Sequence, residues 1–174
     1  MNLIKIVILS FLITSVVFSQ TETSKNPFWF NWSVGGSTEF INGSFSFNKS
    51  LERFSYQIST NGSFRDFFSR YGIATFNVGF GSSNEKAWMI SSVFLGPSVS
   101  HGEGKYRTNL SGFFWGFGAS LNAQAYFMPL YKIFPDLGIG VELYYNHNIF
   151  QTKNVNYRNV YSIRLGFCIT NIHL

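Results

Sequence analysis

The residues best placed for nucleophilic catalysis lie in one short stretch of the chain. His101 follows Ser98 and Ser100 closely, and Glu103 lies two residues after it. A serine nucleophile needs a histidine base and an acid in mutual contact. Ser100 and His101 are sequence neighbours, and neighbours in an extended strand point to opposite faces. This spacing argues against a triad, and the sequence therefore predicts no catalytic residues.

Metal and cofactor sites also lack the residues that they need. The chain has three separated histidines and a single cysteine, Cys168, which cannot form a credible zinc site. The glycines of Gly35-Gly36 and of Gly138-x-Gly140 precede no helix whose N-terminus could bind a phosphate. The net charge is +5, but the basic residues are scattered, which argues against nucleic-acid binding. We expect no metal, no cofactor and no nucleic-acid partner.

The composition limits the kind of fold that can position these residues. The 174 residues are 45% hydrophobic and 20% aromatic but only 12% charged, whereas soluble domains are about 25% charged. So many aromatic residues exclude a disordered chain. No apolar run reaches the roughly 18 residues that a membrane-spanning helix needs, which excludes a bundle of such helices. The chain is apolar on average but never over a long stretch.

Past residue 27, apolar and small polar residues alternate with a period of two, which is typical of strands with two different faces. The pattern predicts eight strands, at 28–37, 41–48, 53–61, 73–81, 87–100, 112–127, 137–147 and 157–170. Residues that favour turns separate these segments. The clearest turn signals are Asn48-Lys49-Ser50, Asn61-Gly62, Gly81 to Asn84, His101 to Gly104, Pro129 with Pro135-Asp136, and Asn146 to Asn156.

The apolar face of these strands could point inward, as in a soluble barrel, or outward to lipid. Most of the strands reach the roughly 9–11 residues that a tilted membrane strand needs. Their polar face is mainly Ser, Gly, Asn and Gln, whereas strands that face water usually carry charge. Aromatic residues gather near strand ends, where rings would meet the membrane surface. We therefore predict an all-β fold, an eight-stranded antiparallel up-and-down transmembrane β-barrel.

Three charged residues fall on the face that would line the barrel interior, the lumen: Arg53, Glu142 and Arg164. Eight strands leave an interior just wide enough to be filled by side chains, so a wide pore is not expected. A hairpin of the last two strands, centred near positions 152–153, places Glu142 close to Arg164. Since a lone charge in a low-dielectric interior is unfavourable, we expect a lumen ion pair. It could plug the lumen or gate small ions.

The aromatic and basic segment 62–72 is the candidate binding loop. It could contact the phosphates of lipopolysaccharide or a partner protein, or it could fold back onto the rim of the barrel. The residues of this predicted extracellular loop are Phe64, Arg65, Phe67, Phe68, Arg70 and Tyr71.

The one continuous apolar stretch lies at the start of the chain. A short basic leader, Met1 to Lys5, precedes an apolar segment, Ile6 to Phe18, and Val17-Phe18-Ser19 is typical of a signal-peptidase cleavage site. The alternative is an uncleaved anchor helix, but the run is short and lacks a stop-transfer flank. We predict a signal peptide at 1–19, an N-terminal periplasmic extension at 20–27 and an outer-membrane β-barrel domain at 28–174.

The sequence resembles the small eight-stranded outer-membrane β-barrel proteins of the Bacteroidetes type. The resemblance spans the chain after the leader and rests on the Ser19-Gln20 junction, the segment from Leu95 to Ser100, the Pro-containing turn before Leu137 and the final strand from Tyr161 to Thr170. One departure is the final Leu174, where such barrels often end in Phe.

The resemblance implies a non-enzymatic protein of the cell outer membrane with a structural or interaction role, such as an accessory subunit of an envelope complex. The expected partners are outer-membrane lipid, lipopolysaccharide included, and a protein of the envelope. The alternatives are a narrow channel for ions or very small solutes, a lipid-A-modifying barrel enzyme and a soluble periplasmic ligand-binding barrel.

Overall fold

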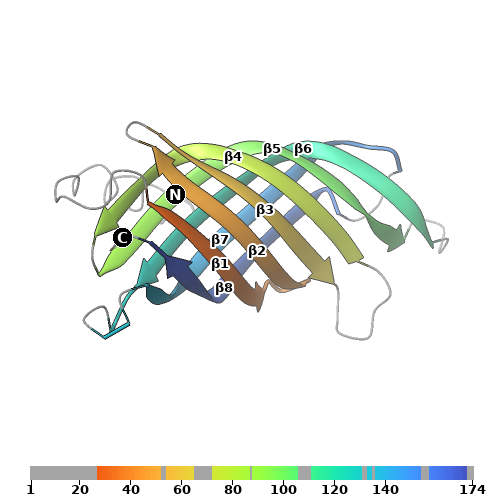
Figure 1. The fold of residues 1–174 in the computed structure, drawn as a ribbon. Coiled ribbons are helices and arrows are strands. Elements are labelled where there is room, and N and C mark those ends of the chain that lie inside the picture. The colour runs from red at the N-terminus through yellow and green to blue at the C-terminus, as the bar shows by residue number, and fades with distance from the viewer. Residues whose placement is uncertain are drawn as a thin grey trace, which may run out of the picture.

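Eight antiparallel strands form a closed barrel in which each strand pairs with its neighbours in sequence and β1 pairs with β8 (Figure 1). This computed structural model describes residues 27–51, 54–64, 72–86, 88–105, 111–130, 133–134, 136–153 and 157–171. The strands are β1 (Phe28–Gly36), β2 (Ile41–Leu51), β3 (Phe54–Phe64), β4 (Gly72–Lys86), β5 (Met89–Lys105), β6 (Ser111–Phe127), β7 (Leu137–Gln151) and β8 (Asn159–Thr170). The predicted up-and-down barrel is therefore confirmed. The predicted signal peptide at 1–19 lies outside the described residues, as does all of the 20–27 extension except Pro27.

The apolar face of the strands points outward and the polar face points into the lumen. In β8, every second residue from Val160 to Thr170 is buried, and the residues between them are exposed. Leu165 is 69% exposed on the outside, whereas Arg164 beside it is completely buried. Phe117, Val141 and other apolar strand residues are exposed in the same way. The alternative of a soluble barrel with these side chains inside is therefore wrong.

Several predicted turns are wrong, because the ladders continue through them. Gly62 pairs with Ala74 across β3 and β4, and His101 pairs with Trp115 across β5 and β6. Gly, Asn and Ser favour turns in water, but a narrow lumen also needs small or polar side chains. The same residue types therefore extend the strands here. The turn signals that lie inside strands are Asn48 to Ser50, Asn61-Gly62, Gly81 to Asn84, His101 to Gly104, and Asn146 to Gln151.

The connections between the strands divide into two groups, one at each end of the barrel. The strand ends that flank residues 37–40, 65–71, 106–110 and 152–158 gather at one end, here called the loop end. The strand ends that flank residues 52–53, 87–88 and 128–136 gather at the other, near the first and last strand residues; this is the terminal end (Figure 1). No helix long and apolar enough to cross a membrane occurs in the part of the chain that the structure describes.

Candidate functional site

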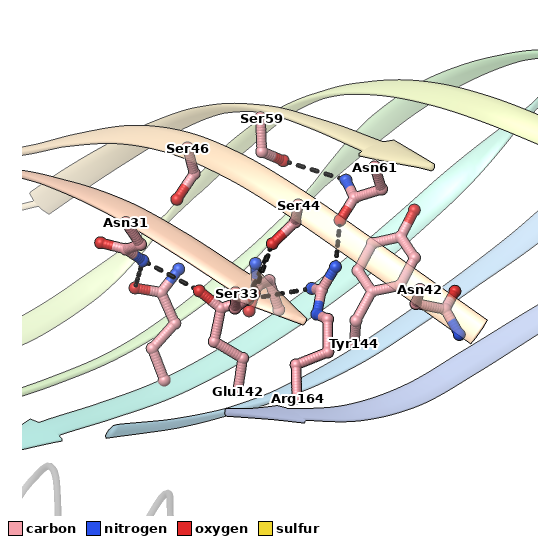
Figure 2. A network of polar contacts seen from close by, with 12 residues as sticks. Asn31, Ser33, Asn42, Ser44, Ser46, Ser59, Asn61, Glu142, Tyr144 and Arg164 are labelled. Atoms are coloured by element: carbon pink, nitrogen blue, oxygen red, sulfur yellow. Dashed lines mark hydrogen bonds and ion pairs between the residues drawn. The ribbon is translucent and has the colours of Figure 1, made fainter. Parts of the chain in front are cut away.

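The centre of the lumen is occupied by a polar network around one carboxylate, that of Glu142 on β7 (Figure 2). Its Oε1 accepts hydrogen bonds from Asn31 Nδ2 at 3.1 Å and from the Tyr126 hydroxyl at 2.5 Å. Its Oε2 accepts from the hydroxyls of Ser33 at 2.7 Å and Ser44 at 3.2 Å. Four neutral donors from β1, β2 and β6 thus converge on a buried anion, which compensates for the water that it has lost.

Arg164 on β8 supplies the opposite charge. The β7–β8 register places Glu142 and Arg164 directly opposite each other, and Arg164 Nη2 lies 3.1 Å from Glu142 Oε2. Arg164 Nη1 also donates to Asn61 Oδ1 on β3 at 2.5 Å, and the guanidinium carbon lies 4.6 Å from the ring centroid of Tyr144. Both charged side chains are completely buried. Arg53, the other charged residue predicted to line the lumen, lies outside the described residues.

The network crosses the lumen and ties the first strands to the last ones. Glu142 links β7 to β1 and β2, and Arg164 links β8 to β3. The alternation in the sequence indicates that these side chains point inward. It does not indicate which of them meet across the barrel, because those contacts depend on the stagger of the strands. Sequence analysis consequently missed the partners Asn31, Ser33, Ser44, Asn61 and Tyr126.

An apolar cluster fills the lumen on each side of this network. The cluster toward the terminal end consists of Trp29, Ile90, Phe94, Tyr126, Met128 and Cys168. The cluster toward the loop end consists of Phe40, Ile73, Phe114, Tyr144, Tyr157 and Val160. The polar network therefore lies between two apolar clusters, and neither cluster was predicted from the sequence.

The apolar cluster at the loop end includes residues from the connections themselves. Phe40 lies between β1 and β2, and Tyr157 lies between β7 and β8. The Tyr157 ring centroid is 5.4 Å from that of Phe40 and 5.7 Å from that of Phe114, on which it stacks. Residues from two connections thus contribute buried aromatic rings to the cluster at the loop end. The sequence gives no signal for this, because isolated aromatic residues in turns have no period.

The candidate catalytic residues are not brought together. His101 lies on the outer surface, where Nδ1 donates to the Phe114 carbonyl oxygen at 3.1 Å and the ring packs on Trp115. Ser100 points into the lumen and bonds to Asn148 Oδ1 at 3.1 Å. Ser98 is buried in the lumen as well. The strand wall therefore separates His101 from both serines, as the alternation predicts.

Of the predicted extracellular binding loop, only Phe64 is described. It is the last residue of β3, not part of a loop, and its ring is exposed. The other residues of the loop lie outside the described residues: Arg65, Phe67, Phe68, Arg70 and Tyr71. Within the described ranges, no group of three or more His, Cys, Asp or Glu side chains could hold a metal ion.

The comparisons with known proteins concern the fold alone. No family model and no curated protein sequence matches the chain. Three solved structures that do match are Neisserial surface protein A, the N-terminal β-barrel domain of OprF from Pseudomonas aeruginosa, and Ail, the attachment invasion locus protein of Yersinia pestis, in complex with the heparin analogue sucrose octasulfate.

The TM-scores of these three structures are 0.60, 0.57 and 0.51, at 7%, 7% and 12% sequence identity respectively. The matches cover 86%, 86% and 87% of this chain and 99%, 100% and 100% of the other chains. At such identities the likeness concerns architecture and carries no activity. The chain therefore shares with these small proteins the fold of a closed, eight-stranded antiparallel β-barrel.

Proposed function

We propose that this protein is a non-enzymatic β-barrel of the bacterial outer membrane, of the Bacteroidetes type, exported by the signal peptide at 1–19 and inserted through the domain at 28–174. The observation that carries the proposal is the inverted polarity of the barrel. Leu165 and its apolar neighbours face outward, whereas Glu142 and Arg164 lie inside. An outward apolar band around a polar interior suits a bilayer and would be unstable in water.

The enclosed lumen supports a structural or interaction role over conduction. Apolar clusters lie in the lumen on both sides of the ion pair, and the Glu142 carboxylate accepts hydrogen bonds from four neutral donors. An ion that passed along the lumen would have to displace side chains of both apolar clusters and break the Glu142–Arg164 ion pair. We therefore assign the interactions of the protein with other molecules to the two ends of the barrel. An accessory subunit of an envelope complex is the role that we favour.

The sequence also supports a polyanionic partner at the loop end. Basic residues outnumber acidic ones in the connections and strand ends there: Arg65, Arg70, Lys105, Arg107, Lys153 and Arg158 against Glu39, Asp66 and Glu103. Phosphate groups of lipopolysaccharide are the polyanion nearest to such a surface in an outer membrane. The similar Ail barrel has been solved with a sulfated heparin analogue, which supports the same ligand chemistry.

Binding of lipopolysaccharide by the purified full chain tests the polyanion part of the proposal. We expect the double variant R65A/R70A to bind at least tenfold more weakly than the unaltered chain. K49A, which removes a charge at the terminal end, is the matched control and should bind as the unaltered chain does. Equal affinities for both variants would contradict a binding site at the loop end.

Two further measurements test the location and the role. Extraction from outer membranes with mild detergent should recover the chain without residues 1–19 and together with a stoichiometric protein partner. Recovery as a lone barrel would contradict the subunit role. In planar bilayers the purified barrel should show no unit conductance. A reproducible conductance would support the alternative function, a narrow channel for ions or very small solutes.

A further inference from the structure

One connection at the terminal end differs from the other two. Only two residues separate β2 from β3 and β4 from β5, whereas the nine residues at 128–136 separate β6 from β7. It is folded locally: the amides of Ile133 and Phe134 both donate to the Leu130 carbonyl, at 2.8 and 2.7 Å. Figure 1 shows its described residues projecting beyond the ends of β6 and β7. Its length exceeds what is needed to join two neighbouring strands, and the extra residues require an explanation.

This connection is held on both sides by neighbouring backbone. The Met128 amide donates to the Trp88 carbonyl at 2.8 Å, which joins it to the β4–β5 turn. The Thr170 amide donates to the Asp136 carbonyl at 2.9 Å, which joins it to the end of β8. The first and last residues of the connection are therefore bonded to neighbouring backbone.

Three of its apolar side chains are exposed. Leu130 is 50% exposed, Ile133 is 69% exposed and Phe134 is 58% exposed. Leaving side chains of this size in water is unfavourable by about 1.5–3 kcal/mol each relative to full burial. They do not reach into the lumen, whose cluster at this end contains Met128 but none of the three. Another phase or another molecule must cover them.

The exposed patch is continuous with the apolar outer surface of the barrel. Phe127 and Leu137, which flank the connection, are themselves exposed on the outside. Trp88 stacks on Phe127 with ring centroids 6.2 Å apart, and Lys86 Nζ lies 5.9 Å from the Trp88 ring centroid. Tryptophan and lysine side chains of this kind are typical of the headgroup level of a bilayer. The patch therefore begins where the lipid-facing wall ends.

We propose that the connection at 128–136 is an interfacial membrane anchor, which inserts Leu130, Ile133 and Phe134 among the acyl chains of phospholipids in the periplasmic leaflet. This inference rests on the proposed outer-membrane location. Phospholipid is the occupant because the bilayer that covers Phe127 and Leu137 reaches the patch without interruption. A protein partner would have to compete with that lipid for the same surface.

Spin labels in vesicles of phosphatidylethanolamine and phosphatidylglycerol test the anchor. Cys168 is the only cysteine of the chain, so the full-length C168S variant accepts one new labelled cysteine at a chosen site. I133C reports on the anchor, L165C on the lipid-facing wall and E39C on a water-exposed connection. The measured quantity is collision with oxygen, which concentrates in lipid, relative to a water-soluble nickel chelate.

We expect the oxygen-to-nickel ratio at position 133 to exceed that at 39 several-fold and to lie below that at 165, because an interfacial site is shallower than the centre of the lipid-facing wall. The F134C variant repeats the measurement at a second site in case I133C folds poorly. Ratios at 133 and 134 that match position 39, with a lipid-like ratio at 165, overturn the anchor and leave a protein as the occupant. A water-like ratio at 165 overturns the membrane location itself, and the anchor with it.

Discussion

Replacement of Glu142 by Gln tests whether the lumen network stabilises the barrel. The substitution keeps the volume of the side chain, so no cavity is created, but it removes the negative charge. Arg164 would then remain completely buried with neutral acceptors alone, Asn61 Oδ1 and the amide oxygen of the new side chain, and with the Tyr144 ring beside it. A buried guanidinium without a counter-ion is strongly unfavourable. We therefore expect E142Q to unfold more readily than the unaltered barrel.

The structure also sets the size of the effect. Removing one partner of a buried ion pair costs about 3–5 kcal/mol, which is roughly a 100-fold or larger change in the folding equilibrium at about 1.4 kcal/mol per factor of ten. R164M should cost less than E142Q. In that variant the Glu142 carboxylate keeps its four neutral donors, from Asn31, Ser33, Ser44 and Tyr126.

The assay is unfolding in urea of the barrel reconstituted in lipid vesicles, followed by tryptophan fluorescence. The double variant E142Q/R164M contains neither charge, so its loss should be smaller than the sum of the two single losses by about 1–3 kcal/mol. If the single losses simply add, the two side chains act independently and the role assigned to the pair is refuted.

Three other substitutions probe the lumen packing and the outer face, with the same assay. G79V should destabilise the barrel by about 1–3 kcal/mol, because a Cβ at Gly79 would lie 2.9 Å from Phe94 Cβ; F94G, which removes that Cβ, should reduce this loss, and an unreduced loss would contradict the contact. Y157A removes the ring that packs on Phe40 and should cost about 3–5 kcal/mol, yet it should still conduct no ions because the cluster at the terminal end remains; a conductance would show that the mouth alone closes the lumen. L165R should cost about 2–4 kcal/mol if Leu165 faces the middle of the bilayer, whereas L165I should be neutral; equal stabilities of the two would contradict lipid exposure.

The fold follows from the sequence because the pattern that specifies it is local. Alternation in a segment such as 159–170 assigns each residue to a face, and the number of such segments gives the number of strands. Centring the hairpin of the last two strands near positions 152–153 also places Glu142 opposite Arg164, since an antiparallel register is fixed once the turn is located. Both inferences need only neighbouring strands.

Features that depend on distant strands could not be predicted. Contacts such as Ser44 to Glu142 and Asn61 to Arg164 cross the lumen and depend on the stagger of the whole barrel. The strand ends were placed too early for a different reason. Gly and Asn favour turns, but in a narrow lumen they are also the side chains that fit, so residues such as Gly62 indicate either structure equally well.

The lumen is filled with packed side chains, as the core of a soluble protein is, but many of these side chains are polar or charged. Arg164 and Glu142 are among the largest completely buried side chains, together with Trp29, Tyr126 and Phe94, and they fill volume as aromatic rings would. A glycine faces one of these bulky groups: a Cβ at Gly79 would lie 2.9 Å from Phe94 Cβ. Large side chains set against small ones are how narrow barrels fill their interiors. An interior occupied in this way supports the proposal that the protein meets other molecules at its two ends.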